Sequence, residues 1–417
     1  MNGIIISIGD ELVLGQTVNT NATWLSRELA ALGITVSEHI TLADDVEAIK
    51  VYLQQVGQAR DVILATGGLG PTKDDLTRIA LAQVLGSALR LHEPTLRQIK
   101  QFFEERGREM PDTNRIQAMI PTGCEVLENK LGTACGMQVQ IGRAAAFFLP
   151  GVPQEMRDIF AGSVKNKLQQ MIAFKGTNGV IMTRTLHTVG VGESDIAERL
   201  GRMMDRDRNP LINSTAAQGI VSLRINARAK NEVEALCLIE PAEREIWRRL
   251  GSSVYGVDDE TLAQVVGQLL REQHKTLAVA ESCTGGLLGK ELTDIAGSSD
   301  YFKCGWVVYS NQAKIDMLGV DAETITQYGA VSEQVARHLA ERARHLGQAD
   351  YGIGITGIAG PTGASEDKPV GLVYIAVAEG DNSSVKRHVF PGDREMVRLR
   401  TVNMALNMLR KKILPGN

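Results

Sequence analysis

The sequence predicts an α/β protein with two or three domains. The chain has 417 residues, which is more than a single hydrophobic core usually serves. Near both ends of the chain, short apolar runs alternate with helical patterns, and most of these runs lead into glycine-rich or small polar loops. Strands that alternate with helices form parallel sheets, whose ligands bind at the loops that follow the strands. We therefore expect the functional residues in those loops.

Composition and charge exclude several classes of protein. Hydrophobic residues make up 43% and charged residues 23%, as in an ordinary globular protein. The formal net charge of −4 argues against a nucleic-acid partner. We expect no secretory leader and no membrane partner, because no apolar run approaches the roughly 18 residues of a membrane span. The five cysteines lack zinc-site or redox spacing, which favours reduced thiols and a cytoplasmic location.

The beginning of the chain predicts a βαβαβ unit. Apolar runs at 4–8, 34–42 and 61–66 predict buried strands, and the periodic patterns at 19–32 and 46–56 predict the helices between them. Such a unit forms a largely parallel sheet that is covered by helices on both faces.

A glycine-rich loop follows the third strand and leads into a helix expected at 76–85. Its glycines would let backbone N–H groups approach a phosphate closely, and the start of the helix adds a favourable dipole. The loop has neither the Walker A pattern nor the dinucleotide-binding G-x-G-x-x-G pattern. The residues expected to bind the phosphate are Gly67, Gly68, Gly70 and Thr72.

Four acidic residues follow strands of this sheet. Asp74 and Asp75 come after the glycine-rich loop, and Asp10 and Glu11 come after the first strand. Carboxylates beside a phosphate would repel it unless a divalent metal lay between them, so these residues are candidate metal ligands. Alternatively, Asp74 and Asp75 only stabilise the helix N-terminus. Lys73 could support phosphate binding or compete with the metal.

Three loops together carry a resemblance to a known family. A further strand at 144–149 is followed by Pro150 to Met156, with Pro153 suited to the first turn of a helix. In order and spacing, the loops Gly9-Asp10-Glu11, Gly67-Gly68-Leu69-Gly70-Pro71-Thr72 and Leu149-Pro150-Gly151-Val152-Pro153 resemble the molybdopterin-binding-like domain of the CinA family. The resemblance implies that 1–170 is this α/β domain. It also implies an ADP-ribose pyrophosphatase that needs a divalent metal (Mg, Mn or Co).

The region 171–257 has weaker patterns. Strands are expected at 183–189 and 220–227, with a helix at 194–204. A second helix, 231–250, contains Pro241, which predicts a break or kink. The turn from Gly190 to Ser194 resembles that of the small α+β connector domain of full-length CinA proteins. We favour a spacer over a catalytic role, and expect 254–259 to be the linker.

The region 258–417 predicts a third α/β domain with strands and helices in alternation. The expected strands are 276–280, 302–309, 350–356, 370–378 and 385–390, and the expected helices include 262–270, 287–296, one beginning at 310–314, one capped by Ser332, and 395–409. Three of its strands end in small polar or glycine-rich loops at 282–286, 309–314 and 356–363.

Ser282 is the candidate nucleophile of this domain. All seven histidines lie outside the three loops, and the G-x-S-x-G and S-x-x-K patterns both fail here. A buried lysine can replace histidine as the base, and Lys314, with Tyr309 nearby, is on the next loop. The alternatives are that Ser282 or Thr284 caps a helix, that Lys314 is an exposed helix residue and that Tyr309 is a core aromatic. Cys283 is expected to be a small buried residue.

The motifs of this last region resemble the C-terminal α/β domain of the CinA family. They are Glu281 to Gly286, Tyr309-Ser310-Asn311 with Lys314, Gly329 to Ser332, Thr356 to Pro361, Lys368 to Gly371 and Gly392-Asp393-Arg394. The resemblance implies an amidohydrolase that converts nicotinamide mononucleotide to nicotinate mononucleotide and ammonia, without a cofactor. It also favours a homodimer.

From this resemblance and the loop pattern we assign roles. Ser282 would attack the carboxamide, Lys314 would take its proton and Tyr309 would help to relay it. Backbone N–H groups around Thr284, Gly285 and Gly286 would hold the oxyanion. The nucleotide would contact Asn311, Thr356, Gly357, Ala359 and Gly360.

The sequence thus predicts a bifunctional hydrolase of pyridine nucleotide recycling, with nicotinamide mononucleotide and ADP-ribose as substrates. The alternative is a binding protein linked to competence and DNA damage, with one or both pockets vestigial. Release of ammonia from nicotinamide mononucleotide would separate the two.

Overall fold

The computed structural model describes residues 1–175 and 179–414. The two stretches left out, 176–178 and 415–417, fall within the predicted middle and final regions. The chain divides into two compact units, which are described separately. The first is Met1–Met182 with Ala227–Cys237, and the second is Thr183–Asn226 with Leu238–Asn417.

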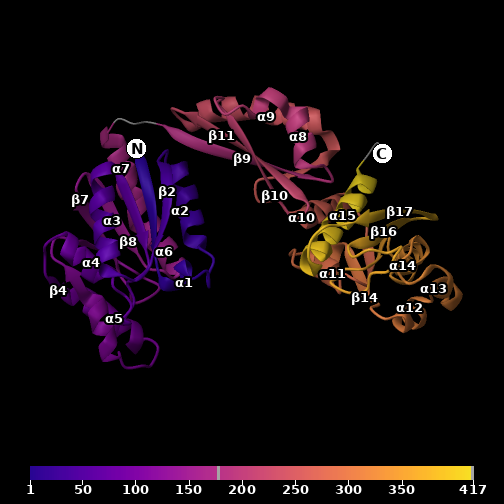
Figure 1. The fold of residues 1–417 in the computed structure, drawn as a ribbon, viewed down its shortest axis with the longest axis horizontal. Helices are drawn as coiled ribbons and strands as arrows, with labels where there is room; N and C mark the ends of the chain where they lie inside the picture. The colour runs from indigo at the N-terminus through magenta and orange to yellow at the C-terminus, as the bar shows by residue number, and fades with distance from the viewer. Residues whose placement is uncertain (176–178, 415–417) are drawn as a thin grey trace. The chain divides into compact units, whose positions relative to one another are not determined.

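The first unit is built on a six-stranded sheet with the order β2-β1-β3-β8-β7-β6 (Figure 1). Its strands are β1 (Asn2–Ile8), β2 (Thr35–Leu42), β3 (Val62–Thr66), β6 (Glu125–Leu127), β7 (Gly136–Ile141) and β8 (Ala144–Leu149). The pairs β1/β2, β1/β3 and β3/β8 are parallel, whereas β7 is antiparallel to β8 and to β6. The predicted, largely parallel α/β sheet is confirmed.

The central strand β1 is buried on both faces, which explains its unbroken apolar run. Ile4 and Ile6 pack in the same core as residues of α3 (Val46–Ala59). Ile5 packs on the other face with residues of α2 (Thr20–Ala31). Side chains alternate between the faces of a strand, so an apolar residue is needed at every position.

The remaining elements of this unit surround the sheet. They are α1 (Asp10–Val13), α4 (Thr77–Val84), β4 (Leu89–Leu91), α5 (Glu93–Glu104), the 3₁₀ helix η1 (Asp112–Ala118), β5 (Met119–Pro121), α6 (Pro153–Ile159), the π-helix η2 (Phe160–Val164) and α7 (Lys165–Lys175). The elements between 86 and 143 had no counterpart in the sequence prediction. Strands of only three residues, such as β4 and β6, are too short to show a period.

The middle of the chain forms a four-stranded sheet with the order β10-β11-β9-β12. Its elements are β9 (Val180–Val189), α8 (Glu193–Leu200), η3 (Gly201–Met204), β10 (Leu211–Ala217), β11 (Ile220–Ala229), α9 (Glu232–Leu250), η4 (Gly251–Ser253) and β12 (Val254–Val257). The expected linker at 254–259 is wrong, because it contains β12, which pairs with β9. Of the break or kink expected at Pro241, the break is absent, since α9 continues through this residue.

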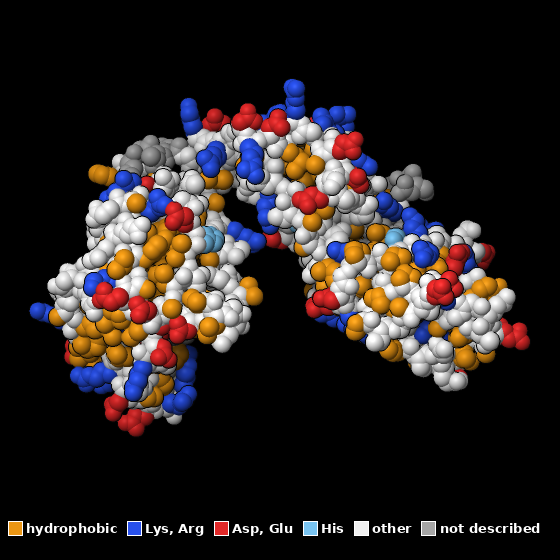
Figure 2. Space-filling view, in the orientation of Figure 1, with side chains coloured by type: hydrophobic (Ala, Val, Ile, Leu, Met, Phe, Trp, Pro, Cys, Tyr) orange, Lys and Arg blue, Asp and Glu red, His pale blue; other side chains and the backbone are white. Residues whose placement is uncertain are grey.

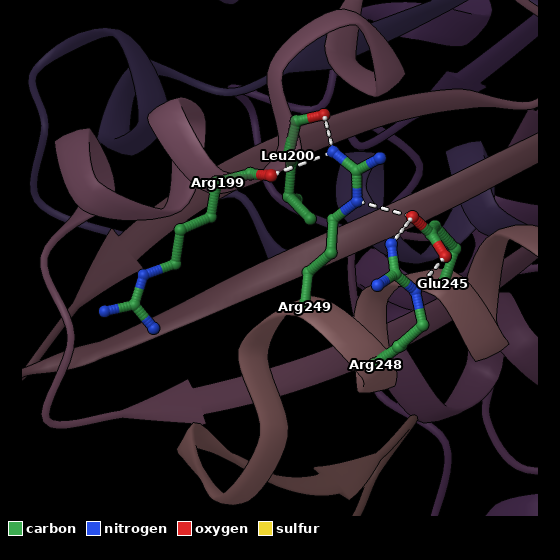
Figure 3. Close-up of polar contacts among 5 residues, drawn as sticks. All are labelled: Arg199, Leu200, Glu245, Arg248 and Arg249. Atoms are coloured by element: carbon green, nitrogen blue, oxygen red, sulfur yellow. Dashed lines mark hydrogen bonds and ion pairs between the residues drawn. The ribbon is translucent and has the colours of Figure 1, made fainter.

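The last turns of α9 hold the end of α8 (Figure 3). Arg249 Nη1 donates to the carbonyl oxygens of Arg199 at 2.9 Å and Leu200 at 3.0 Å. These carbonyls belong to the last turn of α8, where helical partners are missing. Glu245 accepts hydrogen bonds from Arg248 and Arg249, which lower its pKa to about 2. On the face drawn in Figure 2, basic and acidic side chains are interspersed along α9.

Arg410 joins this middle domain to the final one within the second unit. It is 3% exposed, and burial lowers its pKa. Its guanidinium donates to the carbonyl oxygens of Val254 and Ser252 and to Oδ1 of Asn407. No carboxylate contacts it among the described residues, so a buried charge is held by neutral acceptors alone.

The final domain is a five-stranded sheet with the order β14-β13-β15-β16-β17. Its strands are β13 (Leu277–Glu281), β14 (Phe302–Val307), β15 (Tyr351–Gly357), β16 (Leu372–Glu379) and β17 (Asn382–Val389). Its helices are α10 (Leu262–Glu272), α11 (Leu287–Thr293), η5 (Ser298–Asp300), α12 (Asn311–Leu318), α13 (Ala322–Tyr328), α14 (Glu333–Leu346) and α15 (Arg394–Ile413). The predicted cap Ser332 accepts from the N–H of Val335, which confirms it.

The central strand β13 again packs on both faces. Leu277 and Val279 lie in the core formed with α10 and α15, and Ala278 and Ala280 lie in the core formed with α14. Because β13 runs parallel to both β14 and β15, the loops after all three strands meet at one edge of the sheet. No helix of the described residues is long and apolar enough to cross a membrane.

Candidate active sites

The loops after β13 and β14 bring Ser282 and Lys314 into direct contact. Nζ of Lys314 lies 3.1 Å from Oγ of Ser282. Ser282 follows β13 directly, and Lys314 is in the first turn of α12, whose N-cap is Ser310. Serine with a base in hydrogen-bond reach is the arrangement of an activated nucleophile.

Lys314 is held in a setting that disfavours its charged form. Its residue is 2% exposed, so it is not the exposed helix lysine of the alternative interpretation. Besides Ser282, its amine donates to the carbonyl oxygens of Val308 at 2.9 Å and Tyr309 at 3.3 Å. No carboxylate among the described residues pairs with it. Burial therefore lowers the pKa of Lys314, as a general base requires.

A buried carboxylate, not a hydroxyl, caps the helix that follows Ser282. Helix α11 begins at Leu287, and its first N–H groups, from Leu288 and Gly289, donate to Glu281 at 3.1 and 2.8 Å. The alternative that Ser282 or Thr284 is present only as a cap is therefore wrong. Ser282 is free of that role.

A cavity of about 290 Å³ opens beside Ser282 and Lys314. It brings together most of the predicted residues of this domain, namely Ser282, Tyr309, Asn311, Lys314, Thr356, Gly357, Ala359 and Gly360. Arg394 also lines it and was missed as a site residue, although it belongs to a motif quoted for the family resemblance. Its position at the first turn of α15 could not be placed beside Ser282 from sequence.

Three predicted residues do not line this cavity. Thr284 is fully buried, and its carbonyl oxygen accepts from Arg398 at 3.1 and 2.7 Å. The N–H of Gly285 donates to the carbonyl oxygen of Ser282 and so is not free for an oxyanion. Gly285 and Gly286 instead provide the left-handed turn, with φ of +61° and +88°, that leads from β13 into α11.

Tyr309 does not make the contact expected of a proton relay. Its hydroxyl accepts a hydrogen bond of 2.6 Å from Arg394, and its side chain is 57% exposed. In the described part of the chain it bonds to neither Ser282 nor Lys314 through that hydroxyl. It is not a core aromatic either, so it is best placed to contact a ligand. Cys283 is buried as expected, which raises its pKa to about 12.

A larger cavity, of about 720 Å³, lies at the carboxyl edge of the N-terminal sheet. All the predicted N-terminal residues line it: Asp10, Glu11, Gly67, Gly68, Gly70, Thr72, Asp74 and Asp75. Two acidic residues that line it were missed, Asp44 and Glu155. Asp44 lies just after the end of β2, and this position after a parallel strand could have indicated it as a site residue.

Asp75 occupies the position expected for a phosphate. Its carboxylate accepts from the N–H of Gly70 at 2.6 Å, the N–H of Thr72 at 2.8 Å and the hydroxyl of Thr72 at 2.5 Å. The N–H of Gly67 donates a hydrogen bond to the carbonyl oxygen of Leu149. Three of the four backbone N–H groups expected to bind a phosphate, those of Gly67, Gly70 and Thr72, are therefore already bonded within the chain. Asp75 is better described as fixing this loop than as a metal ligand, because three hydrogen bonds already occupy its oxygens.

Asp10 and Asp44 are joined by reciprocal backbone contacts. The N–H of Asp10 donates to Asp44 and the N–H of Asp44 donates to Asp10, each at 3.1 Å. Burial raises the pKa of Asp44, and the charges of Asp10, Glu11 and Asp75 raise it further against the hydrogen bond from Asp10. Carboxylates close enough to repel one another attract a cation.

The donor chemistry fits a hard divalent cation. Carboxylate oxygens from one or two residues, with water and substrate phosphates, are the usual ligands of Mg²⁺. Among the described residues, no three His, Cys, Asp or Glu side chains lie close enough together to hold a metal ion by themselves. A cation here would be held by water together with one or two of the carboxylates of Asp10, Glu11, Asp44 and Asp74.

Comparisons with known proteins cover the whole chain. Residues 4–170 match a family described as a molybdopterin binding domain, 183–256 match the "Damage-inducible protein CinA KH domain" family and 259–413 match the "CinA C-terminal domain" family.

Whole-length relatives agree with these matches. A Clostridium botulinum (strain Loch Maree / Type A3) protein, named as competence-damage inducible, is 40% identical over 414 residues, covering 99% of this chain and 100% of that one. A "CinA-like protein" of Kosmotoga olearia is 40% identical over 415 residues, covering 100% of both. A solved competence/damage inducible protein of Agrobacterium tumefaciens is 44% identical with a TM-score of 0.34, covering 36% of this chain and 91% of that one.

Proposed function

This chain belongs to the CinA family over its whole length, and from that premise we propose that its final domain hydrolyses the carboxamide of nicotinamide mononucleotide to give nicotinate mononucleotide and ammonia. The observation that carries the proposal is the 3.1 Å contact between a buried, uncompensated Lys314 amine and the Ser282 hydroxyl. Burial lowers the pKa of Lys314 and so favours the neutral amine, which can take the proton of serine.

The reaction proceeds through an acyl-enzyme. Ser282 Oγ attacks the carboxamide carbon while neutral Lys314 takes the hydroxyl proton. The C–N bond then breaks, and Lys314 returns that proton to the leaving nitrogen, which departs as ammonia. Water, activated by Lys314, then cleaves the ester and regenerates Ser282. Arg394, which donates to the carbonyl oxygen of Gly360 and to Tyr309, offers a cation for the phosphate of the nucleotide.

The test is direct. Purified protein is incubated with nicotinamide mononucleotide, and ammonia and nicotinate mononucleotide are quantified. The two products should form in equal amounts. Nicotinamide riboside, which lacks the phosphate, and nicotinamide, which lacks the whole ribose phosphate, serve as matched compounds. If the wild type releases no ammonia from the mononucleotide, the proposal is wrong and the alternative of a binding protein is favoured.

A second activity is proposed for the N-terminal cavity: metal-dependent cleavage of ADP-ribose to AMP and ribose 5-phosphate. The observation that favours it is one of charge. Six acidic residues line the cavity, and no Lys, Arg or His is among its described lining residues. A diphosphate entering such a cavity needs a cation to offset repulsion, and a divalent ion also polarises the phosphoryl oxygens and activates water.

In this proposal, one or two of the carboxylates of Asp10, Glu11, Asp44 and Asp74 would hold the cation, while Asp75 keeps the loop after β3 in shape. Addition of Mg²⁺, Mn²⁺ or Co²⁺ to metal-stripped protein should restore AMP formation, and a chelator should remove it. Deamidation in the same samples should be unaffected by the chelator. Cleavage that no metal supports would leave this cavity as a binding site only.

A further inference from the structure

Glu155 is an acidic residue of the N-terminal cavity that has no assigned role. It lies in the first turn of α6, is half-buried and lines the cavity with the metal-ligand candidates. The charges that raise the pKa of Asp44 come from Asp10, Glu11 and Asp75, and Glu155 is not among them. Like Asp74, Glu155 does not act on Asp44, so it is not part of the mutually repelling group Asp10, Glu11 and Asp44.

Asn129 fixes the orientation of the Glu155 carboxylate. Its Nδ2 donates to Oε2 of Glu155 at 2.6 Å and to the carbonyl oxygen of Ala134 at 2.8 Å. Its Oδ1 accepts from the N–H groups of Leu131 and Gly132, each at 3.0 Å. Asn129 is 1% exposed, and with both ends of its amide engaged it cannot turn over. The amide N–H therefore points at Glu155.

Gly132 lets the carboxylate come close to this loop. A Cβ at residue 132 would lie 2.3 Å from the carboxyl carbon of Glu155, so the carboxylate would have to move away from the loop. Gly132 therefore leaves room for the carboxylate in the position that Asn129 sets.

The electrostatic setting of Glu155 makes it more basic than an ordinary glutamate. Burial raises its pKa, against the smaller effect of the Asn129 hydrogen bond. Among the described residues, no Lys, Arg or His forms an ion pair with it. A carboxylate that is oriented, partly desolvated and unpaired resembles a general base more than a structural ion.

We propose that Glu155 is the general base of the N-terminal cavity, a role that rests on the proposed cleavage of ADP-ribose. A water oxygen forms a bond to one phosphorus of the diphosphate while Glu155 takes a proton from that water. The bond between the attacked phosphorus and the bridging oxygen breaks, and that oxygen leaves with the electron pair as part of the second phosphate. Glu155 then releases its proton to solvent.

The test compares Glu155→Gln with Asp158→Asn, which neutralises a second acid of α6 that does not line the cavity. Glutamine is isosteric and can still accept from Asn129, so the fold should be retained, as a thermal melt would verify. With Mg²⁺ present, kcat for ADP-ribose cleavage should fall at least about a hundredfold in Glu155→Gln and stay near wild type in Asp158→Asn. Binding of AMP with Mg²⁺, measured by calorimetry, should change by less than about threefold.

Four outcomes would overturn the proposal. Near wild-type kcat in Glu155→Gln removes Glu155 as the base. Weak AMP binding with kcat retained at saturation makes it a ligand contact instead. If the wild type cleaves no ADP-ribose with any metal, the proposed activity itself is refuted. The wild-type samples alone show this outcome, so it is distinct from a result that concerns only Glu155. If Glu155→Gln unfolds at a lower temperature than the wild type, Glu155→Asp replaces it as the test variant, because aspartate keeps the carboxylate. A fall in kcat as large as that of Glu155→Gln would then contradict the base role.

Discussion

The two cavities differ in how completely the chain prepares them. In the final domain, the proposed nucleophile Ser282 and the proposed base Lys314 already touch, in a small cavity around this buried lysine. In the N-terminal domain, the acids line a cavity more than twice as large, and several of them, such as Asp10 and Asp74, are exposed. Chemistry that depends on the protein's own groups needs those groups desolvated and fixed, whereas a hydrated cation needs an open rim of oxygens. The predictions that follow test this contrast.

The largest effect is expected from Ser282→Ala. The deamidation rate should fall at least about a thousandfold, because the acyl-enzyme cannot form. ADP-ribose cleavage by the same preparation should be unchanged, since the two cavities belong to separate domains. Ammonia release and AMP formation are measured side by side. A variant that loses both reactions while keeping its melting temperature would contradict the independence of the two sites.

Replacing Lys314 with Met should lower deamidation by about a hundred- to ten-thousandfold, the usual contribution of a general base. In the wild type, deamidation should rise with pH and level off above the pKa of Lys314, because only the neutral amine accepts a proton. Burial lowers that pKa, so the plateau should begin below the ordinary pKa of lysine. The measurement is a pH profile of kcat/KM. A rate that falls as pH rises through neutrality would be inconsistent with a lysine base.

The same shift affects stability. Because the folded pKa of Lys314 lies below the unfolded one, the unfolded chain binds the extra proton between the two values. The contribution of Lys314 to the free energy of unfolding should therefore increase with pH across that window and be constant above it. Chemical denaturation of the wild type and Lys314→Met at several pH values would measure it, and a parallel pH dependence in both would exclude the effect.

Substitutions of Asp74 and Asp75 should have different effects, the first on metal-dependent cleavage and the second on stability, although the two residues are neighbours. Asp74→Asn should reduce metal-dependent cleavage at least about tenfold without changing the melting temperature. Asp75→Asn should lower the free energy of unfolding by about 1–3 kcal/mol, since an amide cannot accept all three hydrogen bonds from Gly70 and Thr72. Metal titrations and denaturant unfolding distinguish the two. Equal stability with equal loss of metal affinity would return Asp75 to the ligand set.

The smallest effect is expected from Tyr309→Phe. Removal of the hydroxyl deletes the contact with Arg394, so KM for the nucleotide should rise a few-fold, by about 1 kcal/mol, with kcat nearly unchanged. Steady-state kinetics at saturating substrate decide the matter. A hundredfold fall in kcat would instead support a proton-relay role, although the Tyr309 hydroxyl contacts Arg394 in this structure.

Sequence was informative wherever strand ends fixed positions. Parallel strands bring their loops to one edge, so topology alone predicted that the loops of Ser282 and Lys314 meet, and that the N-terminal acids meet the glycine-rich loop. The choice of Lys314 over an exposed helix lysine came from the resemblance to the CinA family. Side-chain direction did not follow. Asp75 in Thr72-Lys73-Asp74-Asp75 could have faced a ligand or its own loop, and only the backbone course of the loop decides between them.

Two of the missed residues, Glu155 and Arg394, could not be predicted for the same physical reason. Glu155 depends on Asn129, 26 positions earlier in the chain, and Arg394 reaches Tyr309 across 85 positions. Neither contact leaves a local period or spacing in the sequence. β12 was assigned to a linker because four residues are too few to show alternation, although its pairing with β9 makes it part of a sheet.

The buried guanidinium of Arg410 has an evolutionary consequence. A gene fragment that began at residue 258 would encode every loop of the cavity beside Ser282, yet it would remove the Ser252 and Val254 carbonyls that accept from Arg410. Each hydrogen bond lost from a buried charge costs about 1.5–3 kcal/mol, a large part of the stability of a single domain. A lineage that separated this domain as an independent gene would therefore have to replace Arg410, or supply new acceptors, before or together with the split.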